Sequence, residues 1–165
     1  MKKKKFITVA IDSPAAAGAG TQSKLIAKHY KLFYLDTGKI YRHIGLLRIK
    51  YKTKLTYGII RKNILKLNMK LLTNNKLLTD EVAISASIVA RDKKVRDIVH
   101  KFQQKCAYDP PKKFNGSVLD GRDITSIQVK DAMFKFFITA SLITRAKRRF
   151  EEYRKLKKNI SLNEV

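Results

Sequence analysis

The stretch FITVAIDSPAAAGAGT, residues 6–21, decides the fold of this chain. Its first six residues carry no charge and are rich in β-branched types, which predicts a short buried strand. A turn of small residues follows, and a helical pattern runs from Thr21 to Tyr30. A strand, a small-residue loop and a helix in this order are typical of a P-loop, in which the backbone N–H groups and the dipole of the helix N-terminus bind phosphate.

The loop departs at two positions from G-x-x-x-x-G-K-[ST], the usual phosphate-binding pattern. Ser13 stands where the first glycine belongs, and Ala19 replaces the lysine that grips the phosphates, whereas Gly18 keeps the second glycine. Small side chains still let the backbone approach a phosphate closely. We predict an ATP-binding loop made of Ser13, Pro14, Ala15, Ala16, Ala17, Gly18, Ala19, Gly20 and Thr21. From the motif alone, a strand-turn-helix joint without a ligand remains the alternative.

Length and composition indicate one domain, because the chain has 165 residues and 44% of them are apolar. The single cysteine, Cys106, excludes an internal disulfide and fits a reducing compartment. The apolar run after Met1–Lys5 is too short for a signal peptide, and no run approaches the ~20 apolar residues of a membrane span. We therefore expect a cytoplasmic protein with no membrane partner.

The formal net charge of +24 attracts polyanions and speeds encounter with anionic substrates. The basic residues are mostly lysines spread along the whole chain, beside many isoleucines and asparagines. This pattern also fits a general bias of composition, so nucleic acid is not the expected partner.

Strands and helices are expected to alternate along the chain. Apolar runs predict further strands at 32–35, 118–119 and 134–139. Helical spacing predicts helices at 40–50, from Thr79 to Ala90, at 95–106 and after Ser141, with Leu142, Ala146, Phe150 and Tyr153 as the apolar stripe of the last. Residues 51–78 are hard to interpret beyond a helix near Ile59–Leu67 and a turn at Asn74-Asn75. The alternation predicts an α/β fold, a parallel sheet with helices on both faces.

Three polar clusters follow three of these strands: the loop 13–21, the segment 36–42 and the segment 120–123. Ligands of open α/β sheets bind at the carboxyl ends of the strands. One phosphate loop between two arginine-bearing loops suits a donor phosphate and an acceptor phosphate brought together.

These segments carry a resemblance to bacterial cytidylate kinases, which move the γ-phosphoryl group of ATP to CMP or dCMP. The pattern D-[ST]-G-x-I-Y-R is intact at Asp36–Arg42, and D-G-R-D-I stands at Asp120–Ile124, followed by Thr125-Ser126 in place of Gly-Thr. F-x-T-A-S stands at Phe137–Ser141, with RAKRR at 145–149. The resemblance spans residues 6–150 and argues against adenylate, thymidylate and shikimate kinases.

The resemblance implies a three-layer α/β/α P-loop NTPase fold in one domain, 1–165, with a core at 6–36 and 114–155 and a helical monophosphate-binding insertion at 37–113. It implies CMP contacts from Thr37, Arg42, Arg122 and Asp123, of which the last three are also the expected catalytic residues. Arg145 and Arg148 would lie on the ATP side, although a basic helix face is a close alternative. Mg²⁺ would be held mainly through the ATP phosphates, with Thr21 or Asp120 as outer partners and no protein metal site. We expect a monomer.

Three departures put catalysis in doubt. Ala19 lacks the cation that bridges the β- and γ-phosphates; Lys24 or Lys39 are the candidates to replace it. Gln104 stands where the family usually has an arginine on the CMP phosphate, with Lys101 or Lys105 as partial substitutes. The family's arginine-bearing lid has no counterpart here, so we expect a C-terminally truncated chain or a protein without a lid. The alternatives are a nucleotide-binding homologue with weak or no catalysis and a basic polyanion-binding module.

Overall fold

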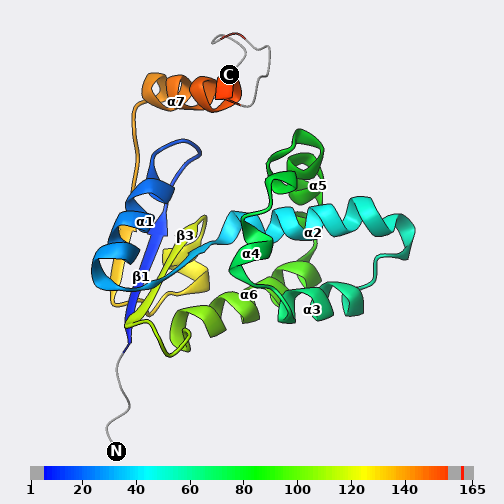
Figure 1. Ribbon diagram of the computed structural model, residues 1–165, viewed down its shortest axis with the longest axis horizontal. Coiled ribbons are helices and arrows are strands. Elements are labelled where there is room, and N and C mark those ends of the chain that lie inside the picture. Colours follow the sequence, from blue (N-terminus) through cyan, green and yellow to red (C-terminus); the bar gives the residue numbers. More distant parts are fainter. Residues whose placement is uncertain (1–5, 156–160, 162–165) are drawn as a thin grey trace, which may run out of the picture.

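The computed structural model describes residues 6–155 and residue 161. Its centre is a parallel sheet of β1 (Ile7–Asp12), β2 (Phe33–Asp36), β3 (Gly116–Gly121) and β4 (Phe134–Phe137), in the order β2-β3-β1-β4 (Figure 1). The register sets Val9 opposite both Val118 and Phe134. The parallel sheet is confirmed, and the expectations for Met1–Lys5 and for most of the residues after 155 lie outside the described residues.

Helices cover both faces of the sheet, because successive strand side chains point to opposite sides. On one face Val9, Ile11 and Val118 share a buried cluster with residues of α1 (Ala19–Tyr30). On the other face Ala10, Leu35 and Leu119 share a larger cluster with residues of α2 (Thr37–Tyr51) and α6 (Lys93–Tyr108). The predicted three layers are therefore present.

The segment between β2 and β3 is wholly helical and projects from one side of the sheet (Figure 1). Between α2 and α6 it contains η1 (Lys52–Lys54), α3 (Tyr57–Leu65), α4 (Met69–Leu72), η2 (Asn75–Leu78) and α5 (Asp80–Arg91). Thr79 caps α5 as predicted, accepting the N–H of Val82 at 3.4 Å. Residues 37–113 are all described and include no strand.

The chain departs from the predicted pattern after β3. The connection to β4 is a single turn, η3 (Ile124–Gln128), in place of a full helix. It is held by the carboxylate of Asp12, which accepts the N–H groups of Ile124 at 2.7 Å and Thr125 at 3.0 Å. Strict alternation of strands and helices is therefore wrong at this connection.

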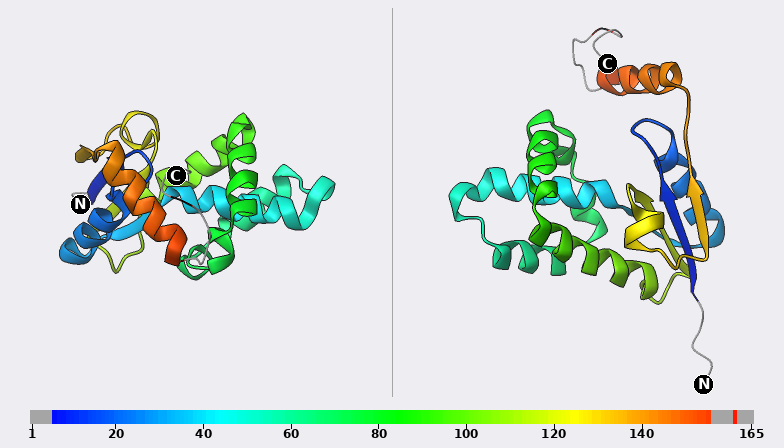
Figure 2. Two further views of the ribbon diagram at one scale, coloured as in Figure 1. Left: turned by 90° about the horizontal axis from the view of Figure 1, so that it is seen from above. Right: turned by 180° about the vertical axis from the view of Figure 1, so that it is seen from behind.

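The last helix, α7 (Leu142–Lys155), stands apart from the sheet (Figure 2). Ser141 caps it as predicted, accepting the N–H of Thr144 at 3.2 Å. Its predicted apolar stripe does not enter a core, since no residue of α7 is buried and Leu142 is 74% exposed. No helix in the described part of the chain is long and apolar enough to cross a membrane.

Candidate active site

The three polar clusters that follow β1, β2 and β3 meet at one cavity of about 700 Å³. Its lining includes the whole loop 13–21, Asp36–Gly38 and Asp120–Asp123. Parallel strands deliver their carboxyl ends to the same edge, so three segments far apart in sequence converge there. Thr37, Arg122 and Asp123, three of the residues expected to contact CMP, therefore line this cavity.

The loop 13–21 is shaped by a few backbone contacts. Ser13 donates its N–H to the carbonyl of Gly121 at 3.2 Å, which ties the loop to β3. Gly18 has a φ of 98°, a left-handed conformation that favours glycine. The helix α1 begins at Ala19, so the N-terminal turn of α1 borders the cavity with Ala19, Gly20 and Thr21.

Asp120 forms the acidic floor of the cavity. Its carboxylate accepts the Tyr34 hydroxyl at 3.0 Å, and its backbone carbonyl accepts the Thr37 hydroxyl at 2.8 Å. Burial, with the nearby charge of Asp36, raises the pKa of Asp120 to about 6, although the Tyr34 bond and Lys24 oppose the rise. Burial also raises the pKa of Tyr34, so this hydroxyl keeps its proton and stays a donor.

Arg122 and Asp123 lie exposed at the start of η3. Asp123 adopts a left-handed φ of 57°, which aspartate tolerates better than most residues. The anchoring of η3 by Asp12 fixes the backbone directly after this pair. The two side chains of opposite charge are therefore presented together at the cavity.

Four cations line the cavity, each from a different element: Lys24 of α1, Arg96 of α6, Arg122 after β3 and Arg149 of α7. Arg149 is paired with Glu152 at 2.8 Å. A cavity edged by a helix N-terminus and these cations has the chemistry to bind phosphate groups.

Comparison with known proteins agrees with this geometry. The family model for cytidylate kinase matches residues 9–165. The chain belongs to the cytidylate kinase family. A cytidylate kinase of Rhodospirillum rubrum is 38% identical over 151 residues, covering 88% of this chain and 69% of the relative. Relatives of the same name from Bartonella bacilliformis (40% over 147 residues, 87% of this chain and 66% of the relative) and Clostridium botulinum (35% over 170 residues, 96% and 76%) agree.

Three arginines expected at the site of this family member do not line the cavity. Arg42 donates to the carbonyl of Leu77 at 2.8 Å, which links α2 to η2. Arg148 donates to the carbonyls of Ala17 at 2.8 Å and Ala16 at 3.4 Å, so it touches the phosphate loop without facing the cavity. Arg145 lies on α7 with its Nε atom buried and without a hydrogen-bond partner.

The structure distinguishes between Lys24 and Lys39, the two candidates to replace the missing P-loop lysine. Lys39 does not line the cavity, and its ammonium lies 4.0 Å from the carboxylate of Asp36. Lys24 lines the same cavity as Ala19 and lies close enough to Asp120 to lower its pKa. Lys24 is therefore the better candidate.

Arg96 borders the cavity although no sequence motif pointed to it, and Gln104, the residue at the family's arginine position, does not. Gln104 is exposed and does not line the cavity, and Lys101 and Lys105 lie on the far side of α6. Arg96 and Gln103 do line it, and Arg96 is oriented by donating to the carbonyls of Ala90 at 3.1 Å and Arg91 at 2.6 Å. The seven-residue spacing of 96 and 103, two helical turns, was the signal that both share one face.

The residues at the cavity suit a Mg²⁺ ion that is held mainly by bound phosphates and contacted by protein oxygen atoms from outside. Thr21 and Asp120 both line the cavity and offer oxygen atoms, the ligands that Mg²⁺ prefers. In the described part of the chain, no group of three His, Cys, Asp or Glu side chains is arranged to hold a metal ion.

Proposed function

We propose that this chain transfers the γ-phosphoryl group of ATP to CMP or dCMP, giving CDP or dCDP. The observation that carries the proposal is the convergence of the phosphate loop with Asp36–Gly38 and Asp120–Asp123 at one cavity of a cytidylate kinase family fold. Such transfer depends on holding the two nucleotides in line and neutralising charge on the moving group, so no general base is assigned.

The proposed donor side is formed by the loop 13–21 and the N-terminal turn of α1. Backbone N–H groups would bind the ATP phosphates, with Lys24 supplying the cation that Ala19 lacks. Arg148 would support the loop through its carbonyls, and Arg149 would face the ATP phosphates from α7. Arg145, which does not line the cavity, would join the ATP side only if its side chain turned toward it. Mg²⁺, bound mainly through the phosphates near Thr21 and Asp120, would supply charge neutralisation.

The proposed acceptor side lies between α2, α6 and η3. Asp123 can accept a hydrogen bond from the exocyclic amine of cytosine, which uracil lacks. Arg122 would bind the cytosine and sugar side of CMP with it. Arg96 is the best-placed guanidinium on α6 for the CMP phosphate, where a planar fork binds two oxygens at once. Arg42 would join it from α2 after leaving the carbonyl of Leu77, and Thr37 borders the same site.

We further propose that the protein is a cytoplasmic monomer that works without nucleic acid. The single cysteine supports a reducing compartment. Sedimentation of the purified chain tests the monomer.

The first test measures ADP formation from ATP with CMP, with UMP as control, for the unmodified chain and for Ala19→Lys. CMP-dependent turnover by the unmodified chain is the expected result. Turnover only by Ala19→Lys would instead support a nucleotide-binding homologue with weakened catalysis. Binding that ignores base identity and falls steeply with salt would support the polyanion-binding module and contradict the kinase.

The same assay tests the substitute cation. Lys24→Ala should lower kcat by about 10²–10³, the usual cost of losing one preorganised group of this kind. Lys28→Ala, an exposed lysine one turn further along α1 that does not line the cavity, is the control and should leave kcat unchanged. Equal kcat values in all three proteins would exclude Lys24.

A further inference from the structure

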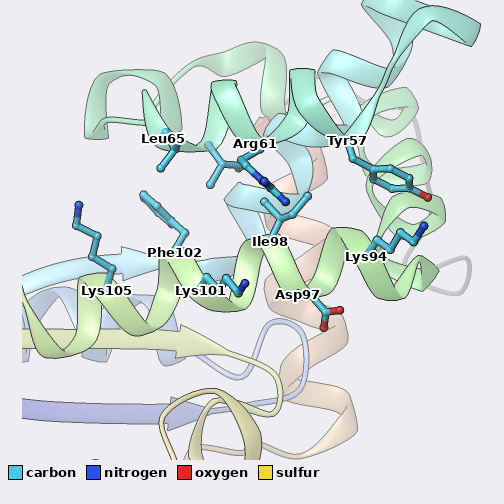
Figure 3. A pocket seen from close by; sticks show the side chains of 10 residues that line it. Tyr57, Arg61, Leu65, Lys94, Asp97, Ile98, Lys101, Phe102 and Lys105 are labelled. Atoms are coloured by element: carbon cyan, nitrogen blue, oxygen red, sulfur yellow. The ribbon is translucent and has the colours of Figure 1, made fainter.

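A second cavity lies on the side of α6 away from the nucleotide cavity. It has a volume of about 710 Å³ and lies between α3 and α6 (Figure 3). Arg96 and Gln103 occupy one face of α6, whereas Ile98, Lys101 and Lys105 fall on the opposite face at helical spacing. The second cavity therefore uses a surface of α6 that the proposed reaction leaves unused.

The floor of this cavity is apolar and open to solvent. Figure 3 shows Leu65 of α3 opposite Phe102 of α6, with Ile98 further along α6 near the end of the Arg61 side chain. Leu65 is 73% exposed and borders the same cavity as Phe102 and Ile98, so the apolar residues here form a contiguous surface rather than a single exposed side chain. A further cavity of about 690 Å³ shares Leu65, Phe102 and Lys105 and continues past Met69 to Phe114. We call the two together the α6 groove.

The rim of the α6 groove is basic. Arg61, Lys94, Lys101 and Lys105 border its first part, and Lys112 and Lys113 border its continuation, against Asp97 and Asp109. Within residues 6–155, the ion pairs of the structure are Lys39–Asp36, Arg149–Glu152 and Arg154–Glu151, all outside the groove. Among the rim cations, Lys94 and Lys113 lie 5.2 Å from the centres of the Tyr57 and Phe114 rings, and the others are open to carboxylates of another molecule.

We propose that the α6 groove binds an acidic amphipathic helix of a partner protein. The groove follows α6, whose 16 residues span about 24 Å, the length of a helix of four to five turns. In this mode of recognition an apolar stripe at i, i+4 and i+7 enters the groove, and here carboxylates on its flanks would reach the rim cations. Charge complementarity makes the acidic partner the expected one.

Single-stranded nucleic acid fits this surface less well. Binding of bases needs successive free aromatic faces, whereas the rings of Phe33 and Phe114 pack against each other with centroids 5.7 Å apart and Lys113 lies over Phe114. The ring of Tyr57 is already covered by the ammonium of Lys94 at 5.2 Å, and its hydroxyl donates to Asp92 at 2.9 Å. Phe102 is left as the aromatic face of the α3–α6 part of the groove.

The probe is a fluorescent peptide of about 18 residues, long enough to span the groove, with leucines at i, i+4 and i+7 and glutamates on both flanks. Its reference is a peptide of the same composition, scrambled so that no apolar face forms. Anisotropy with the full chain at physiological salt should show at least about tenfold tighter binding of the amphipathic peptide, or 1.4 kcal/mol. Equal binding of both peptides would mean that net charge alone accounts for the binding, and it would overturn the proposal.

Variants locate the binding surface. Leu65→Glu and Lys101→Glu should each weaken peptide binding about tenfold. Their matched controls are Leu25→Glu, at a leucine of α1 that is 57% exposed, and Lys62→Glu, at an exposed lysine of α3 outside the groove lining. Equal losses of peptide binding in the controls would overturn the proposal. Competition by a single-stranded oligonucleotide would also overturn it, if Lys101→Glu weakens binding of the oligonucleotide and Leu65→Glu does not. Thermal unfolding of each variant verifies that it is folded.

Discussion

At the scale of single residues, the site differs from a usual P-loop at Ala19, where a methyl group replaces an ammonium. The cations around the cavity come instead from four separate elements. The positions of these cations depend on which helix face carries them and on the contacts that hold the loops, more than on the P-loop motif. Residue substitutions therefore discriminate between the roles that we propose.

Arg96→Ala should raise KM for CMP and leave KM for ATP nearly unchanged. A hydrogen bond to a charged group contributes ~1.5–3 kcal/mol, so kcat/KM for CMP should fall roughly tenfold to a hundredfold. Arg96→Lys should recover only part of the loss, because an ammonium is a single point charge. Steady-state kinetics with each nucleotide varied in turn measures the effect.

The control for Arg96 is Lys93→Ala, an exposed cation at the start of the same helix that does not line the cavity. It should change neither KM. Equal increases in both KM values of Arg96→Ala would mean that the arginine supports only the α5–α6 junction, where it donates to Ala90 and Arg91.

Asp120→Asn should change how stability depends on pH. The pKa of Asp120 is raised from 3.8 to about 6, so the folded chain keeps a proton that the unfolded chain has lost. The free energy of unfolding of the unmodified chain should therefore fall, relative to Asp120→Asn, as pH rises from about 4 to about 6. The rise in pKa corresponds to about 3 kcal/mol.

Urea denaturation of both proteins at several pH values measures this difference. Burial lowers the pKa of His43, which has the opposite effect on stability just below its ordinary value of 6.5. The histidine is present in both proteins, so its contribution cancels in the comparison. Parallel stability curves over this range would show that the carboxyl is not held protonated in the folded state.

At the scale of elements, α2 and α5 pack with backbone contact at Gly45. A Cβ atom there would lie 2.7 Å from the N atom of Ala86 and 2.9 Å from the carbonyl oxygen of Val82. Ser85 closes the same contact by donating its hydroxyl to the carbonyl of Gly45 at 3.1 Å. This crossing holds α5 against α2, the helix that borders the proposed acceptor side.

Gly45→Ala should lower the free energy of unfolding by about 1–3 kcal/mol, the usual cost of overpacking. The control is Gly58→Ala in α3, where the nearest atom to a new Cβ is the Thr56 hydroxyl at 3.7 Å. It should raise stability by roughly 0.5–1 kcal/mol, because alanine favours a helix over glycine. Urea denaturation distinguishes the two, and similar effects from both would contradict the close crossing.

Elements with a clear local signal were predicted well, and elements defined by their neighbours were not. Thr79 and Ser141 cap the expected helices, because a cap is a contact within a few residues. The stripe of α7 was correctly helical, but spacing does not say whether a partner surface faces it. The short η3 turn depends on Asp12, more than a hundred residues earlier, which no local pattern reveals.

At the scale of the whole molecule, basic residues lie around the nucleotide cavity and also on surfaces away from it. A net charge of +24 attracts nucleotides of any kind, so specificity must come from the few groups at the cavity. The same charge gives the α6 groove a basic rim around an apolar floor. The helix α6 thereby separates two surfaces that differ in chemistry, the nucleotide cavity and the α6 groove that we propose for an acidic amphipathic helix.

The sequence by itself determined the parallel α/β architecture, the phosphate loop, the meeting of three polar clusters and the family to which they belong. These follow from local patterns, because strand and helix periodicity and small-residue turns are encoded by neighbouring residues. Only the tertiary structure decided that Lys24 and Arg96 border the cavity, that Arg42 and Arg148 bind backbone carbonyls, and that α6 has a second, open groove. The direction of a long side chain depends on contacts between segments far apart in the chain, and only the folded molecule brings those segments together.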